Sequence, residues 1–255
     1  MLAVIFLTLT PGGLCQESEK WKEYHTPHVI IYYKDVPEDF IKSIEETAEY
    51  YYQEITANLG FTRYENWSWD SRAKIYLYRD DREYLKAYKQ ASWSHGMAAV
   101  REKVIRTFPS AHGFFDSTLP HELGHIIFRE FVGFKADIPI WLEEGVAMYQ
   151  EKARRWGANK TVKEAIENKK FMSLGELSKL ELYGTDAKTA DLFYAESASV
   201  VYYLMTELGK YKFLTLCAQL KSGDSFERAL LTTYIRFKNI DDLNRSWMDY
   251  LERGN

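Results

Sequence analysis

The sequence His121-Glu122-Leu123-Gly124-His125 is followed, after eighteen intervening residues, by Glu144. Residues four apart share one face of a helix, so His121 and His125 can bind one metal ion together. Glu122 would then lie beside the ion, where a general base for water is needed. A later carboxylate would complete three protein ligands and leave a fourth position open for water or substrate. This pattern predicts a zinc hydrolase.

The residues around the motif predict a buried helix. From Thr118 to Val132, apolar side chains recur on every side, as expected of a helix in a core. Thr118 or Ser117 can cap its start, and Gly133 can end it. Two histidines and a glutamate would be costly to bury in such a helix unless something satisfies them, and a metal ion does so. The alternative interpretation is a core helix with incidental histidines.

The third ligand has to be a carboxylate or a cysteine if it follows the motif. No histidine follows the motif, because the six in the chain are His25, His28, His95, His112, His121 and His125. A metzincin would need a histidine six residues after His125, and that position is Phe131. Cys217 stands in an apolar stretch, where a free cysteine is usually a small core residue. Glu144 is therefore the better candidate, and its neighbour Glu143, which points about 100° away on a helix, is the alternative.

Two segments resemble the gluzincin peptidases. In that family the H-E-x-x-H motif is followed after eighteen residues by a ligand glutamate, often within W-L-x-E-G-x-A, and Trp141 to Ala147 matches every specified position. The chain resembles the bacterial peptidase MA-like domains in particular. The resemblance implies that His121, His125 and Glu144 bind one Zn²⁺ ion. A weaker alternative is an aspartate ligand of the aspzincin type in Gly184-Thr185-Asp186, but that aspartate arrives one residue early.

The periodicity along the chain predicts an α+β fold of thermolysin-like, gluzincin architecture. Residues 20–114 are expected to form an α/β lobe with a small mixed sheet: strands at 29–33, 74–78, 97–100 and 104–108, a long helix at 37–59, and a short helix from 80 or 81 to about 90. Residues 115–255 are expected to form the metal-binding and helical lobe, with helices at 139–155, 162–168, 174–182, 190–208, 211–221, 225–234 and 240–252. The helix that carries His121 and His125 would lie at the junction of the two lobes, beside a cleft for substrate.

The composition and the first residues bear on partners and compartment. A net charge of −4 gives no basic footprint for nucleic acid. Residues 1–15 contain an uncharged apolar stretch followed by small residues, as in a signal peptide, and the stretch is too short to cross a bilayer. The chain is therefore expected to be exported to the periplasm, the cell surface or the medium, with no transmembrane helix in the mature chain; the alternative to cleavage is an anchor at its N-terminus.

Residues beyond the metal are less well defined by the sequence. The gluzincin resemblance implies a tyrosine that stabilises the oxyanion, for which Tyr194 is the candidate, and an edge strand at residues 96–100 that holds the substrate backbone. His95 and His112 could line the cleft. An acid four residues after the ligand glutamate would orient a metal histidine in some families, but that position is Met148.

The predicted function is zinc-dependent hydrolysis of peptide bonds with Glu122 as general base. An endopeptidase is favoured because no acidic pair that could bind a substrate amino terminus is evident beside the metal helix. The alternatives are a catalytically inactive, zinc-stabilised scaffold and a nonpeptide zinc hydrolase. Retention of Glu122 argues against the scaffold, because a merely structural site has no use for a base.

Overall fold

A mixed five-stranded sheet forms one side of the molecule. The computed structural model describes residues 20–61, 71–88, 97–109, 113–182 and 184–253, so the predicted signal peptide and both His95 and His112 lie outside the described residues. The strand order is β1-β2-β3-β5-β4. The three central strands are parallel, and both edge strands pair antiparallel to their neighbours. The strands are β1 (Lys22–His25), β2 (Val29–Tyr33), β3 (Ala73–Leu77), β4 (Met97–Ala99) and β5 (Val104–Thr107).

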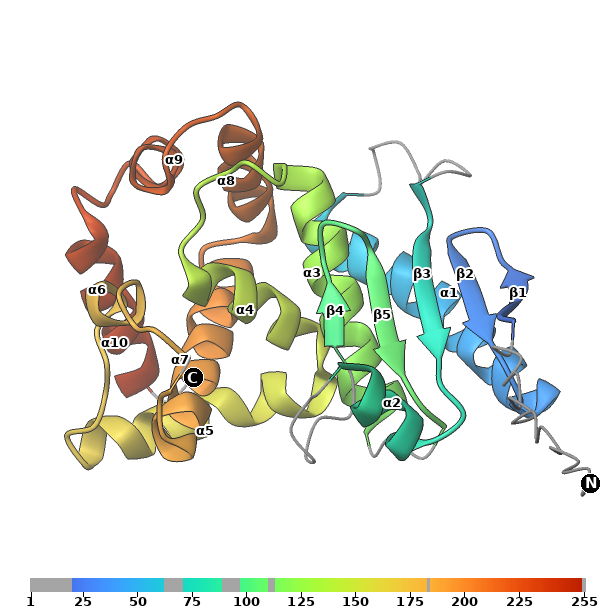
Figure 1. Cartoon of the computed structure of the whole chain (residues 1–255). Helices are drawn as coiled ribbons and strands as arrows, with labels where there is room; N and C mark the ends of the chain where they lie inside the picture. Colours follow the sequence, from blue (N-terminus) through green and yellow to red (C-terminus); the bar gives the residue numbers. More distant parts are fainter. Residues whose placement is uncertain (1–19, 62–70, 89–96, 110–112, 183, 254–255) are drawn as a thin grey trace, which may run out of the picture.

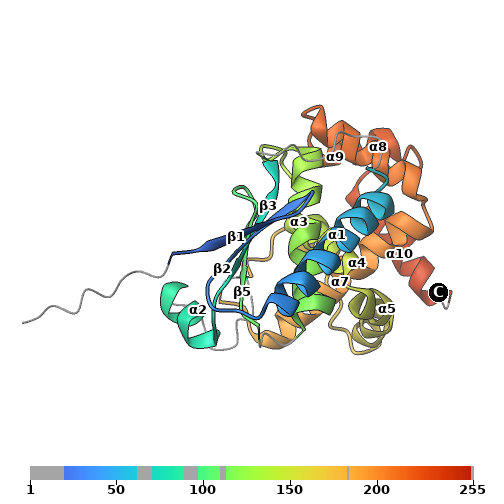
Figure 2. The ribbon, with the colours of Figure 1, turned by 90° about the vertical axis from the view of Figure 1, so that its right-hand side faces the viewer.

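The long helix α1 (Glu38–Leu59) covers one face of this sheet together with helix α3 (Leu119–Val132), which carries His121 and His125, as Figure 2 shows. Its apolar side, which includes Ile41, Ile44 and Ile55, is buried. The helix ends at Gly60, whose φ of 81° is readily adopted by glycine. The short helix α2 (Asp81–Tyr88) lies toward the other face, where Tyr84 packs against Tyr78 and Phe108.

The rest of the described chain is helical, and α3 lies between the sheet and these helices (Figure 1). A mixed α+β fold is therefore confirmed. None of the described helices is both long and apolar enough to cross a membrane. The helices after α3 are α4 (Ile140–Gln150), α5 (Lys152–Glu167), α6 (Leu174–Leu177), α7 (Ala187–Thr206), α8 (Lys210–Lys221), α9 (Phe226–Thr233) and α10 (Ile240–Glu252).

The start of helix α3 differs from the prediction. The chain enters α3 from a π-helical turn, η2 (Phe114–Thr118), and Thr118 already has helical backbone angles with no capping bond from its side chain. The hydroxyl of Ser117 donates to Glu151 instead of capping the helix. The predicted caps were therefore wrong, because the π-helical turn leads into α3 without a break, and the backbone N–H groups of Ser117, Thr118 and Leu119 already donate to carbonyl oxygens at Gly113 and Phe114.

The predicted helix over residues 139–155 is also wrong in its extent. Its backbone is interrupted at Glu151, which is extended (φ −80°, ψ 98°) and separates α4 from α5. Helix α5 then runs without a break through Gly157, where a break was predicted. A single glycine costs a helix only about 1 kcal/mol, which packing can offset.

Gly145 is required where α4 crosses α7. A Cβ added to this residue would lie 2.3 Å from the carbonyl oxygen of Ser197 and 2.6 Å from a methyl group of Val201. Because the first contact is to backbone, the helices would have to separate. We expect Gly145→Ala to lower the free energy of unfolding by about 3 kcal/mol, the upper part of the range for overpacking, as measured by denaturant titration.

Gly157→Ala is the matched control for that variant. A Cβ there meets no atom within 4 Å. Alanine also favours helix over glycine by about 1 kcal/mol, so the control should be neutral or slightly stabilising. Equal stability of Gly145→Ala and the unmodified chain would show that the two helices can move apart at no cost.

Candidate metal centre

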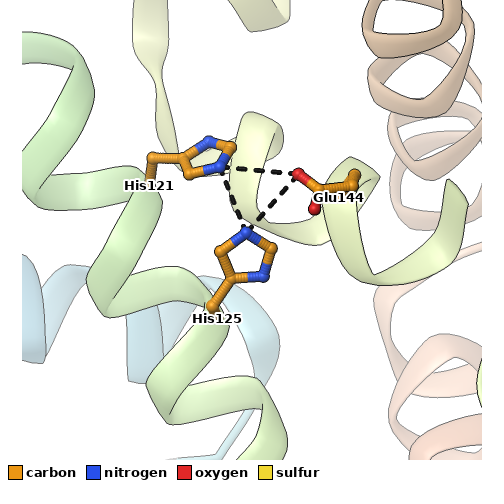
Figure 3. Close-up of side chains that lie close together, drawn as sticks. All are labelled: His121, His125 and Glu144. Carbon is orange, nitrogen blue, oxygen red and sulfur yellow. Dashed lines mark hydrogen bonds and ion pairs between the residues drawn. The ribbon is translucent and has the colours of Figure 1, made fainter. Parts of the chain in front are cut away.

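Three side chains from two helices converge on one point (Figure 3). His121 and His125 come from successive turns of α3, and their Nε2 atoms are 3.1 Å apart. The Oε2 atom of Glu144, on α4, is 3.5 Å from each of these nitrogens. Metal–ligand bonds of about 2.0–2.2 Å at tetrahedral angles place ligand atoms about 3.3–3.6 Å apart. The three atoms thus have nearly the spacing of three corners of a zinc tetrahedron.

The electrostatics of the three groups favour a bound cation. Burial of the His121 imidazole lowers its pKa, but the contacts with Glu144 and Glu151 outweigh this effect and raise the pKa to about 10. The two histidines hold the pKa of Glu144 well below its usual range, although burial acts in the opposite direction. The Glu144 carboxylate therefore attracts positive charge to the point where both Nε2 atoms meet. Two imidazole nitrogens and a carboxylate oxygen are a donor set that suits zinc.

A model of the peptidase MA superfamily matches residues 67–253, which is most of the chain. The chain belongs to the peptidase MA superfamily. The resemblance predicted from the sequence is thereby confirmed. The structure of native yeast LTA4 hydrolase has a similar fold, with a TM-score of 0.53 and 16% sequence identity. The match covers 89% of this peptidase MA chain but only 38% of the yeast protein, and at this identity it shows the fold alone. No curated protein matches the chain.

Glu151 orients the first histidine of this peptidase MA chain. Its Oε1 atom lies 2.8 Å from Nδ1 of His121, and its other oxygen accepts the hydroxyl of Ser117. An acceptor at Nδ1 places the imidazole proton there and leaves the lone pair of Nε2 free for a metal. The sequence did not indicate this residue, because the position four residues after Glu144 is Met148. Glu151 lies seven residues after Glu144, but its extended backbone ends α4, so no regular helical spacing relates it to the other groups.

Glu122 lies on α3 between the two histidines but is not one of the three converging groups. Burial raises the pKa of its carboxyl group, while the positive charge of His121 and His125 lowers it, with a net increase. Glu144 and Glu151 also raise it through charge repulsion. A carboxylate with a raised pKa is a stronger base than an exposed one, and it still gives up a proton readily.

The alternative ligands lie elsewhere. The carboxylate of Glu143 is paired with Arg129, and its Oε1 atom is 3.9 Å from Nδ1 of His125, the ring nitrogen that faces away from Glu144. Asp186 caps the start of α7, where its side chain accepts bonds from the backbone N–H groups of Lys188 and Thr189. The structure thus brings Glu144, rather than Glu143 or Asp186, to the two Nε2 atoms.

Tyr194 is a partly buried residue of α7. It packs against a small cluster of Met148, Ala158 and Ala198, and its ring lies edge-on to that of Phe193. Met148 is one turn after Glu144 on α4, so the Tyr194 ring lies beside the helix that carries the third converging group. The predicted substrate strand corresponds to β4, which is an edge strand of the sheet, although Gly96 lies outside the described residues.

Removing the Glu151 carboxylate should weaken metal binding. We expect Glu151→Ala to raise the zinc dissociation constant about 10- to 100-fold, because His121 loses the acceptor that fixes its tautomer. Chelator competition on the purified protein measures this constant. Glu167→Ala, an exposed residue near the end of α5, is the control and should leave the constant unchanged. Zinc affinity that is the same in both variants would mean that Glu151 only links the end of α4 to α3 and does not support metal binding.

Proposed function

We propose that this chain is a zinc-dependent peptidase in which His121, His125 and Glu144 hold one Zn²⁺ ion. The observation that carries the proposal is the near-tetrahedral spacing of the two Nε2 atoms and one carboxylate oxygen, at 3.1, 3.5 and 3.5 Å. Three protein ligands leave a fourth position for water or substrate, which is typical of catalytic rather than structural zinc sites. Membership of the peptidase MA superfamily supports peptide hydrolysis as the reaction.

The residues around the ion have distinct roles in this proposal. When bound, zinc would polarise the scissile carbonyl and lower the pKa of water at the fourth position. Glu122 accepts the proton of that water and passes it to the leaving amine, for which its raised pKa suits it. Glu151 keeps His121 in the tautomer that binds through Nε2. Tyr194 donates its hydroxyl to the charge that develops on the carbonyl oxygen.

The proposed substrate is a peptide or protein, and the proposed reaction is endopeptidase cleavage. Among the described residues, strand β4 pairs on one side only, with β5, so its other side can add an extended peptide as a further strand. We further propose that residues 1–15 are a signal peptide for export, that residues 20–114 and 115–255 form two lobes, and that nucleic acid is not a partner.

Metal analysis combined with a quenched-peptide library tests the proposal. The purified chain should contain one zinc per molecule and cleave peptides internally, and a chelator should abolish cleavage until zinc is restored. Bound zinc with no cleavage of any peptide would overturn the peptidase and favour a scaffold or a nonpeptide hydrolase. Absence of zinc binding would overturn the metal site itself.

A further inference from the structure

One ring nitrogen of the candidate metal centre lacks a hydrogen bond. Nδ1 of His125 is buried, and among the described residues it has no hydrogen-bond partner. The opposite nitrogen, Nε2, faces His121 and Glu144. If Nε2 binds the metal, the proton of the neutral imidazole is on Nδ1, and a buried donor without an acceptor costs about 1–3 kcal/mol. His125 therefore needs an acceptor at Nδ1, in the way that Nδ1 of His121 already has Glu151.

Glu143 is placed to be that acceptor. Its Oε1 atom lies 3.9 Å from Nδ1 of His125, so an approach of about 1 Å would form a hydrogen bond. The carboxylate reaches this position from the first turn of α4, next to Glu144. A carboxylate oxygen can accept more than one hydrogen bond, so a bond to His125 is compatible with the bond that Oε1 already accepts.

Arg129 holds this carboxylate from α3. Its Nε atom donates to Oε1 of Glu143 over 2.8 Å, and its Nη2 atom donates to Oε2, so the pair is bidentate. Its Nη1 atom donates to the carbonyl oxygen of Ala136 over 3.0 Å, which fixes the connection between α3 and α4. Arg129 follows His125 by one helical turn, and Glu143 precedes Glu144 by one residue, so the pair joins the two helices that carry the three converging groups.

The charge of Arg129 also separates the roles of the two adjacent glutamates. A carboxylate that is bound bidentately by a guanidinium is occupied and has its charge balanced, so Glu143 is a poor competitor for the metal. It keeps a lone pair for a neutral N–H donor. Glu144, which has no arginine in the contacts described for it, keeps its negative charge for the ion.

We propose that Arg129 and Glu143 are a positioning pair for the metal centre. Arg129 holds the Glu143 carboxylate beside His125, and Glu143 accepts the Nδ1–H bond when Nε2 carries the ion. The inference rests on the proposed function, because it requires His125 to be a zinc ligand. Each histidine then has its own carboxylate from α4 or its end, Glu151 for His121 and Glu143 for His125.

The test measures zinc affinity by chelator competition on the full chain. Glu143→Ala should raise the zinc dissociation constant about 10- to 100-fold, while Glu143→Gln, whose amide oxygen can still accept from Nδ1, should recover most of the affinity. Arg129→Gln should weaken binding less than Glu143→Ala does. The double variant Arg129→Gln/Glu143→Ala should be no weaker than Glu143→Ala alone, because both changes act through one contact.

A control and a spectrum separate positioning from a merely structural ion pair. Glu130→Ala removes another α3 carboxylate, which is paired with Lys103, and should leave zinc affinity unchanged. In the cobalt-loaded protein, Glu143→Ala should shift the visible d–d absorption bands, and Glu130→Ala should not. If Glu143→Ala binds zinc with an affinity within about threefold of the unmodified chain and leaves the cobalt bands unshifted, the proposed positioning role of Arg129 and Glu143 is overturned.

The same measurements distinguish failure of the inference from failure of the proposed function. Zinc binding that His125→Ala abolishes, together with an unaffected Glu143→Ala variant, refutes only the positioning pair. Absence of zinc binding by the unmodified chain, or binding that His125→Ala leaves intact, refutes the proposed metal site and the inference with it.

Discussion

Replacing Glu122 with glutamine should reduce peptide turnover by about 10²–10⁴-fold while zinc stays bound, because the amide cannot take a proton from water. Glu122 is not among the three groups that converge on the candidate metal position, so its loss removes a base and no ligand. Glutamine has nearly the same shape, and the buried helix α3 should keep its packing. The expected result is therefore a large fall in kcat with an unchanged zinc content.

The measurement pairs initial rates on a quenched peptide with metal analysis of the same preparation. Glu130→Gln, a carboxylate on the same helix that pairs with Lys103, serves as the control and should retain full turnover. Chelator-sensitive turnover at the rate of the unmodified chain in Glu122→Gln would remove Glu122 from the role of base. Loss of zinc in that variant would show that Glu122 is a ligand instead.

The sequence predicted the elements that have a strong local pattern. Helix α3 is apolar on every side and α1 has a regular apolar face, so both were located to within a few residues. Strand β1 was missed, because its four residues are mostly charged or polar and it is defined by main-chain pairing with β2 rather than by side-chain burial. Backbone pairing of that kind depends little on the side chains, so the sequence gives little signal for it.

The groups around the metal position could be predicted only where the spacing along a helix relates them. His121, Glu122 and His125 are related by one turn of α3, and a known pattern relates them to Glu144. Glu151 was not found, because α4 ends there with an extended backbone, and glutamate is not a residue that usually breaks a helix. The carboxylate contacts His121 and Ser117, which lie 30 and 34 residues earlier in the chain. Long-range contacts of this kind are visible only in the folded chain.

The second large effect is expected from replacing Glu144, which of the two adjacent glutamates is the one at the candidate metal position. Glu144→Ala should weaken zinc binding on the order of a thousand-fold. Zinc sites in small domains bind with about 10–16 kcal/mol, so one ligand of three carries several kcal/mol, and about 4 kcal/mol corresponds to that factor. Loss of the only carboxylate among these three groups also removes the one negatively charged ligand of the ion.

Glu143→Ala is the matched comparison, because it removes the same atoms one residue earlier. It should cost no more than about 100-fold, since its carboxylate contacts Nδ1 of His125 rather than the metal position. Chelator competition on both variants gives the ratio, and melting of the metal-free proteins shows whether either variant is unfolded. Glu144→Gln, which keeps the shape but not the charge, should melt like the unmodified metal-free chain and still bind zinc weakly. A larger loss of zinc in Glu143→Ala than in Glu144→Ala would reverse the assignment, and Arg129 would then have to release its carboxylate when the metal binds.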